Sequence, residues 1–430
     1  MNACGSPGAT ACAVLLPLLA ACAEPDGRGA TAMVRDSAGI TIVENTSPEA
    51  APVYAVSRPV FEVGVVEGAA EYELHDVTSV VRLSDGSVAV ATGGSEIRWF
   101  DEAGVFRRRV GRAGDGPGEF RRIRYMRALP GDSLLAFDSN NRRVSVLAPD
   151  GGFVRSETIG PNDERSVTVA GALRDGTLLT RTVLETPRAS TPLYRVRMGF
   201  AVIRDGAALP LATYLGQEAA LHVEGSGGGI GSVFISVLPF ARSAHATAGP
   251  YHFFIGSSDT WQIDVWDAVG RLVRVIRVAI PVAPVTDDVR HAYIAGELER
   301  MRRAAEERGQ PFQEPAARQQ LHEQPHAPAL PAFGALLATA DGGFWASDYT
   351  MPGAGPVQER WTIFDADGRL TAIIHLPTAF TPLHVDGTSV LGVFRDSLDV
   401  PYVHGYTVSE HERDGREDPE RPRIEAGSGR

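Results

Sequence analysis

The stretch "GRAGDGPGEF" is the segment of the sequence that most resembles a ligand site. Glycine-rich loops can cradle phosphates, but a Walker loop needs Gly-Lys-Ser/Thr after its spacer. Here Gly116 is followed by Pro117, the chain contains no lysine, and no G-x-G-x-x-G pattern opens a helix. The pattern therefore predicts a turn and not a nucleotide site.

A second stretch, "HEQPH", matches the H-E-x-x-H pattern of zinc proteases. That pattern works on a helix, where histidines four residues apart share one face and can bind a single zinc ion. Pro325 lies inside the motif and disfavours a helical conformation at Gln324. We therefore expect His322 and His326 to lie in a connecting segment.

Arginines are dense around the glycine-rich stretch, and two interpretations are open. The side chains could form a patch for an anionic ligand, or alternate residues of outer strands could simply face water. The alternation favours the solvated face. The eight arginines are Arg107, Arg108, Arg109, Arg112, Arg121, Arg122, Arg124 and Arg127.

A repeat organises the elements that would position these residues. An apolar strand, a turn of the Asp-Gly type, an alternating strand and an F-D-x-x-G turn recur along the chain, first in residues 77–111 and then in residues 123–160. Strands that alternate with period two have one buried face, and a period of about 40–50 residues is typical of propeller blades. Six such units predict an all-β fold, a six-bladed β-propeller.

Two segments outside the repeat have expected roles. "GITIVEN" or "FEVGV" could supply the strand that completes the sixth unit. One helical insertion is expected at about residues 285–309, between units four and five, because Thr286 is a good N-cap and an apolar stripe follows. Packing on the propeller surface is favoured for this helix over binding a partner.

The repeat gives the glycine-rich stretch an architectural position between neighbouring blades. It begins where the last strand of the first unit ends and finishes where the second unit starts. A similar loop, Gly64 to Tyr72, precedes the first unit, and Glu71 and Glu119 could accept backbone N–H bonds in the two loops. Glycines supply positive φ angles there. The expected structural junction consists of Gly111, Gly114, Gly116, Gly118, Glu119 and Phe120.

The chain starts with a predicted lipoprotein signal, residues 1–22. An apolar run, too short to span a membrane, ends in Leu19-Ala20-Ala21-Cys22, which resembles a lipobox, so Cys22 is the expected lipidation site. No basic residue precedes the run, and a secretory signal with an incidental cysteine is the alternative. Residues 23–33 are expected to be a tether, 34–409 the propeller and 410–430 a disordered charged tail.

The set of motifs also resembles a known family. "VGRAGDGPGEF" before a strand is similar to the junction of NHL repeats, and "DSAGITIVEN", the junction and "VLGVFRDSLDVPYVHGYTV" together resemble bacterial six-bladed β-propeller lipoproteins over residues 34–408. The resemblance implies the fold and a location in the cell envelope, lipid-anchored and exported, but no defined reaction.

These observations predict a non-enzymatic binding or scaffold module with a protein, peptide or glycan partner at the mouth of the central channel. The net charge of −12, without a basic domain, argues against nucleic acid, and no cofactor is expected. The alternative is a metal-dependent hydrolase or lyase with ligands from several blades around the channel. Its candidate metal ligands are His75, Asp76, His222, His252 and Asp348.

Overall fold

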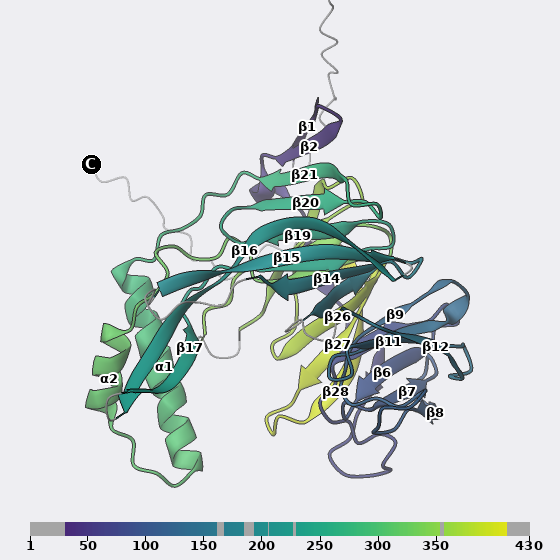
Figure 1. Cartoon of the computed structure of the whole chain (residues 1–430), viewed down its shortest axis with the longest axis horizontal. Coiled ribbons are helices and arrows are strands. Elements are labelled where there is room, and N and C mark those ends of the chain that lie inside the picture. The colour runs from purple at the N-terminus through teal and green to yellow at the C-terminus, as the bar shows by residue number, and fades with distance from the viewer. Residues whose placement is uncertain are drawn as a thin grey trace, which may run out of the picture.

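The structure is a computed structural model, and it describes residues 31–160, 167–184, 193–204, 206–226, 229–352 and 357–410. Strands dominate, and two α-helices lie between the strands β21 and β22 in the chain (Figure 1). The expected all-β class is therefore confirmed.

Two four-stranded antiparallel sheets come first in the ring, and each is built from consecutive strands. The Asp-Gly turns between their strands have the expected positive φ at glycine, as at Gly86 and Gly104. At the second type of turn the Asp101 side chain accepts hydrogen bonds from the N–H groups of Ala103 and Val105. The strands are β5 (Ser79–Arg82), β6 (Val88–Thr92), β7 (Glu96–Phe100) and β8 (Phe106–Val110), then β9 (Ile123–Ala128), β10 (Leu134–Asp138), β11 (Arg143–Leu147) and β12 (Phe153–Thr158).

The next two sheets have more than four strands each. The second gains its extra strands from the N-terminal segment. The first has five strands, of which the fourth is 20 residues long: β13 (Thr168–Ala172), β14 (Leu178–Val183), β15 (Leu193–Arg204), β16 (Ala207–Ser226) and β17 (Gly229–Val237). The second comprises β18 (Ala244–Ala248), β19 (Phe253–Ser257), β20 (Gln262–Trp266) and β21 (Leu272–Val278). β18 is not recognisable in the sequence, because its small residues do not alternate clearly with polar ones.

The last seven strands form two parts of one continuous nine-stranded sheet, whose other two strands come from the N-terminal segment. The first part holds β22 (Leu336–Ala338), β23 (Phe344–Ser347), β24 (Arg360–Phe364) and β25 (Leu370–His375). The second holds β26 (Phe380–Asp386), β27 (Ser389–Arg395) and β28 (Pro401–Glu410).

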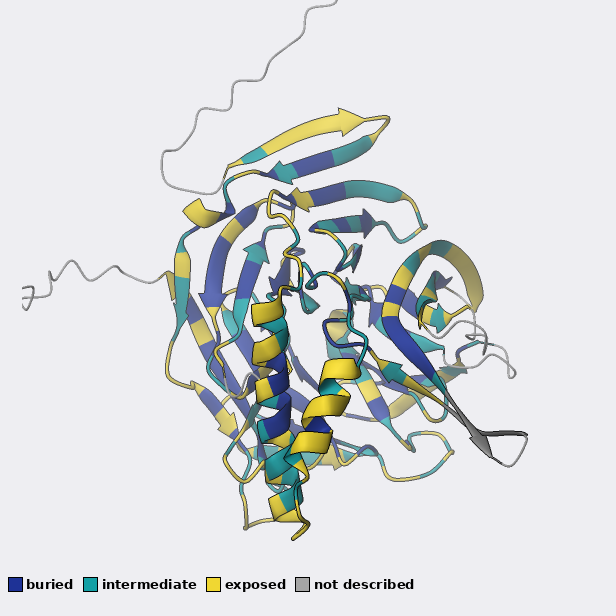
Figure 2. Cartoon of the chain, turned by 90° about the vertical axis from the view of Figure 1, so that its left-hand side faces the viewer, coloured by how far each residue is buried: buried dark blue, intermediate teal, exposed yellow. Residues whose placement is uncertain are grey.

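The N-terminal segment adds strands to the last three groups. "FEVGV" contains β4 (Phe61–Val63), which pairs with β28 and so supplies the expected completing strand. "GITIVEN" contains β2 (Ile40–Asn45), which instead pairs in parallel with β21 and carries the exposed edge strand β1 (Ala32–Ser37), so two residues of the expected tether are in a strand (Figure 2). Between them, β3 (Val53–Val56) pairs with both β25 and β28.

A ring of inner strands closes the molecule. The first strand of each group contacts the first strand of the next, in the order β5, β9, β13, β18, β22, β26 and back to β5. Apolar core clusters lie between successive groups; Trp99 and Leu134, for example, pack in the cluster shared by the first two sheets. Sheets that radiate from an axis and pack face to face form a β-propeller.

The predicted helix is α1 (Asp287–Glu307), and the Thr286 side chain caps it by accepting a hydrogen bond from Val289 N–H. The prediction of a single helix is wrong, because a second helix follows, α2 (Glu314–Glu323). Both pack through a separate apolar cluster that includes Tyr293 and Phe240. No helix in the described part of the chain is long and apolar enough to cross a membrane.

Candidate functional site: the central cavity

A cavity of about 640 Å³ lies inside the ring, and residues of all the inner strands line it. The lining continues into the turns that follow these strands, where Arg174 and Tyr251 are exposed. The cavity therefore opens at this end of the ring. The helices belong to the opposite end, because they precede the start of an inner strand.

Four arginines line the cavity, and the protein satisfies few of their hydrogen-bond donors. Arg127 donates one bond, from Nη1 to the Ala248 carbonyl oxygen at 2.9 Å, and thereby reaches from β9 to β18. Arg82 donates none to the described residues, and its Nε atom is buried. Arg174 stacks on the Tyr251 ring and donates to its hydroxyl at 2.7 Å, and Arg124 is exposed.

The acidic side chains of the lining do not neutralise these arginines. Asp132 accepts hydrogen bonds from the backbone N–H and the hydroxyl of Ser84, at 3.0 and 2.5 Å. Asp386, the second aspartate, forms no ion pair with a cavity arginine in the described part of the chain. The pKa of His384 is lowered to about 4, mainly by burial; Asp386 opposes the shift, and the charges of Arg127 and Arg82 add to it. The imidazole is therefore neutral at pH 7.

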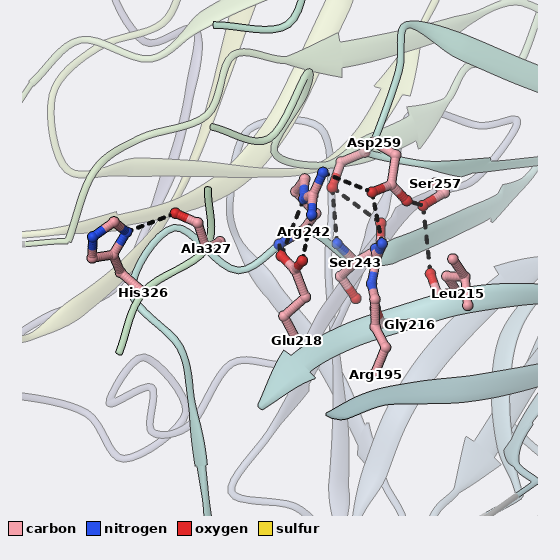
Figure 3. Close-up of polar contacts among 11 residues, drawn as sticks. Arg195, Leu215, Gly216, Glu218, Arg242, Ser243, Ser257, Asp259, His326 and Ala327 are labelled. Carbon is pink, nitrogen blue, oxygen red and sulfur yellow. Dashed lines mark hydrogen bonds and ion pairs between the residues drawn. The ribbon is translucent and has the colours of Figure 1, made fainter. Parts of the chain in front are cut away.

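A second group of charges lies where β15 and β16 meet the segments flanking β18 and β19, and it is fully paired between acids and bases (Figure 3). Arg242 donates to Glu218 through Nε, Nη2 and its backbone N–H. Asp259 accepts from Arg195 at 2.7 Å and pairs with Arg242 at 3.2 Å. We call Arg195, Glu218, Arg242 and Asp259 the four-charge cluster.

The cluster keeps its acids ionised. Burial opposes the ionisation of Glu218, but hydrogen bonds from Arg242 and the charges of Arg242 and Arg195 outweigh it, so the pKa of Glu218 is lowered. The same balance of burial against Arg195, Ser257 and Arg242 lowers the pKa of Asp259. The cluster thus connects outer strands of one sheet to the neighbouring sheet. Its acidic and basic side chains pair with one another.

The glycine-rich stretch is a junction between the first two sheets, in the place that the sequence analysis expected. Gly111, Gly114 and Gly118 have φ angles of 90°, 156° and 72°, while Gly116 does not have a positive φ. The Glu119 carboxylate accepts the Gly116 N–H at 2.8 Å and a bond from Arg112. Phe120 is fully buried in the core between the two sheets.

One arginine of the following sheet anchors each junction loop. Arg143, at the start of β11, donates to the carbonyl oxygens of Asp115, Gly116 and Glu119. Arg98 of β7 donates to the carbonyls of Ala70, Glu71 and Glu73 in the earlier loop. In that loop Glu73, and not Glu71 as expected, accepts a backbone N–H, from Gly68. Backbone contacts of this kind hold each loop in place between the sheets.

The structure places the candidate metal ligands in separate places, and none of them lines the cavity. His75 and Asp76 are exposed in the loop before β5, and Asp76 pairs with Arg122 at 3.7 Å. His222 stacks on Phe234 in the outer strands β16 and β17, and Asp348 pairs with Arg360. His252 follows β18, and burial lowers its pKa. Among the described residues, no three His, Cys, Asp or Glu side chains group as a metal site.

The two histidines of "HEQPH" do not share a helix. His322 is in the last turn of α2, which ends at Glu323, and Gln324 is extended with ψ of 128°. The His326 ring lies against Phe240, and its Nδ1 is 2.8 Å from the Ala327 carbonyl oxygen. Pro325 thus separates the two histidines, but the expectation of a connecting segment is wrong for His322, which lies in the helix because α2 continues to Glu323 before the proline ends it. Cys22 lies outside the described residues.

The arginine-rich segment divides into two sets. Arg108 stacks on Trp99, and five others pair with acids: Arg107, Arg109, Arg112, Arg121 and Arg122. Arg124 and Arg127 line the cavity. The solvated-face interpretation therefore fits the first set and fails for Arg127, which reaches across the ring.

No family model matches the sequence, and no curated protein matches it either. Similar solved structures include a protein from Bacteroides fragilis that is thought to be exported, with 11% identity, a TM-score of 0.45 and coverage of 86% of this chain and 100% of that chain. A DUF4221 family member from Bacteroides vulgatus has 11% identity, a TM-score of 0.47 and coverage of 83% and 98%. A streptogramin B lyase has 11% identity, a TM-score of 0.36 and coverage of 81% and 97%. Because these TM-scores are below 0.5, the strand order and core clusters, and not these neighbours, establish the propeller fold.

Proposed function

We propose that this chain is an exported, lipid-anchored, six-bladed β-propeller of a bacterial cell envelope that binds a ligand and catalyses no reaction. The observation that carries the proposal is the cavity inside the closed ring of inner strands. In this interpretation each inner strand belongs to one blade, the helices are inserted between blades four and five, and β4 completes the sixth blade.

The open end of the cavity is the proposed binding surface. Pockets of about 300–1,000 Å³ are typical for small ligands, and the cavity of about 640 Å³ falls within this range. It is large enough for a small molecule or the end of a peptide or glycan chain, but not for a folded protein. At the opposite end, the segments around Phe240 and Tyr349 pack against the helices.

A ligand screen with a positional readout tests this proposal. The full-length chain is screened by thermal shift, and hydrogen exchange is then measured with each compound that stabilises it. We expect protection of the turns at the cavity mouth, around Asp132 and Tyr251. Protection confined to α1 and α2 would contradict the proposal.

Metal analysis of the purified protein separates binding from the alternative of a metal-dependent hydrolase or lyase. None of the described residues groups as a metal site, so no observation favours the enzyme. A stoichiometric bound metal would overturn the non-enzymatic proposal.

The proposed lipid anchor depends on Cys22. We expect the Cys22→Ala protein to leave the membrane fraction, because lipidation requires the thiol. Fractionation with the membranes at wild-type levels would contradict the anchor while leaving the binding proposal intact.

A further inference from the structure

The cavity has the opposite charge from the molecule around it. Its lining contains four arginines, Arg82, Arg124, Arg127 and Arg174, and two aspartates, Asp132 and Asp386, which leaves an excess of two positive charges (four minus two). The whole chain has a net charge of −12. A charged concave surface with protein walls concentrates its field and attracts ions of the opposite sign.

Arg127 and Arg82 have hydrogen-bond donors to spare. A guanidinium group has five N–H donors, and in the described part of the chain Arg127 uses one of them and Arg82 uses none. Only one of these unused donors, Arg82 Nε, is buried, and a buried polar group without a hydrogen bond costs free energy. These two side chains come from neighbouring inner strands, and the charges of both act on His384 of a third.

The neighbouring side chains neither accept hydrogen bonds from these two arginines nor neutralise their charge. Asp132 is engaged by Ser84, and no described aspartate lies within ion-pair distance of Arg82 or Arg127. His384 is neutral at pH 7 and cannot neutralise a cation. Carboxylates and phosphates match the planar fork of a guanidinium group and accept two hydrogen bonds from it.

We propose that the cavity binds a small organic anion that carries a carboxylate or a phosphate group, with Arg127 and Arg82 as its principal hydrogen-bond donors. The inference rests on the proposed ligand-binding function and specifies its ligand class. Arg174 and Tyr251 flank the mouth through which the anion enters, and Asp386 opposes its binding.

Calorimetric titration of the full-length chain with citrate and with inorganic phosphate tests this inference. We expect binding of at least one probe, and preference between them distinguishes a carboxylate from a phosphate ligand. Arg127→Gln and Arg82→Gln should each weaken that binding about tenfold or more, because each removes a charged hydrogen bond. Asp386→Asn should strengthen it, because it removes a negative charge from the lining.

The matched control is Arg121→Gln, which removes an exposed arginine paired with Asp115 outside the cavity. It should bind the anions as wild type does, and thermal unfolding confirms that each variant is folded. If an arginine variant fails to fold, the opposite effect of Asp386→Asn still tests the inference.

Two results would overturn the inference. One is the absence of citrate and phosphate binding at millimolar concentration, and the other is equal binding by the Arg127→Gln, Asp386→Asn and control proteins. If neutral compounds from the screen instead protect the cavity mouth, the inference fails and the proposed binding function stands. If no compound protects the cavity mouth, both the inference and the proposed binding function fail.

Discussion

The four-charge cluster and the cavity differ in how the protein treats its arginines. In the cluster, Arg195 and Arg242 are matched by Glu218 and Asp259, and hydrogen bonds at 2.7–3.2 Å connect them. In the cavity, Arg82 and Arg127 have no acidic partner within reach. The comparison teaches that arginine content alone does not indicate function, whereas the presence or absence of acidic partners distinguishes the two regions.

The largest expected effect is on the cluster. Arg242→Leu leaves Glu218 buried without its main partner, and breaking a buried pair typically costs about 3–5 kcal/mol. We expect a loss of about 3 kcal/mol in the free energy of unfolding, measured by denaturant titration. A loss below about 1 kcal/mol would show that the cluster is no more constrained than a surface pair.

As the pH falls, the two regions lose their contributions to the free energy of unfolding over different pH ranges. His384 has an ordinary unfolded pKa of about 6.5 and a folded pKa of about 4, so the unfolded chain takes up the proton first as the pH falls. Stability is then lost between about pH 6.5 and 4, by about 2 kcal/mol at pH 5 for this residue. The cluster acids have lowered pKa values, so their contribution is lost only at lower pH.

His384→Gln should therefore reduce the stability loss between pH 7 and pH 5 by about 2 kcal/mol, measured by denaturant titration at both pH values. We attribute the stability loss that remains in this variant to His245. The pKa of His245 is also lowered to about 4, mainly by burial. Arg121→Gln, which removes only an exposed ion pair with Asp115, should leave the pH 7 to pH 5 difference unchanged. A difference that is insensitive to His384→Gln would contradict the neutral imidazole.

Removing an unmatched arginine should cost little stability. Arg82→Met retains much of the side-chain volume and removes a buried Nε that has no partner. We expect a free energy of unfolding within about 1 kcal/mol of wild type, or a gain, because no hydrogen bond is lost. A loss as large as that of Arg242→Leu would remove the distinction between the two regions.

The smallest expected effect is that of Arg121→Gln. The Arg121 and Asp115 side chains are 56% and 62% exposed, so solvent screens their pair. We expect no measurable change in unfolding by denaturant titration. A clear destabilisation would mean that the junction loop depends on this pair as well as on Arg143.

Much of the fold could be predicted from the sequence because local chemistry repeats. Asp-Gly turns, alternating strands, the junction ending in Phe120 and the cap at Thr286 all act within a few residues. The placement of "GITIVEN" could not be predicted, because its partner, β21, is about 230 residues away and the pairing is parallel. The β18 strand has too little alternation to stand out.

The candidate site was harder to predict than the fold. Candidate metal ligands were chosen by residue type, and the structure scatters them. A positional signal was nevertheless present, since Arg82, Arg127 and Arg174 each lie one to four residues before the first turn of a repeat unit, and Asp386 is itself the aspartate of another such turn. The alternating pattern predicted that Arg127 faces water on the outside of the molecule. Such a pattern cannot show whether a polar side chain faces the outside of a ring or the cavity inside it.

The N-terminal strands have a consequence for the order of folding. β4 joins Phe61 to Gly405, and the buried Asn45 side chain bonds backbone groups of residues 277, 368 and 370. The N-terminal strands therefore cannot pair until the C-terminal segments have been synthesised. Pairings between such distant segments form slowly, because a long loop must close first. A chain that emerges in stages from a ribosome or a translocation channel cannot close its ring until β26 has emerged, and β4 stays without its partner until β28 follows.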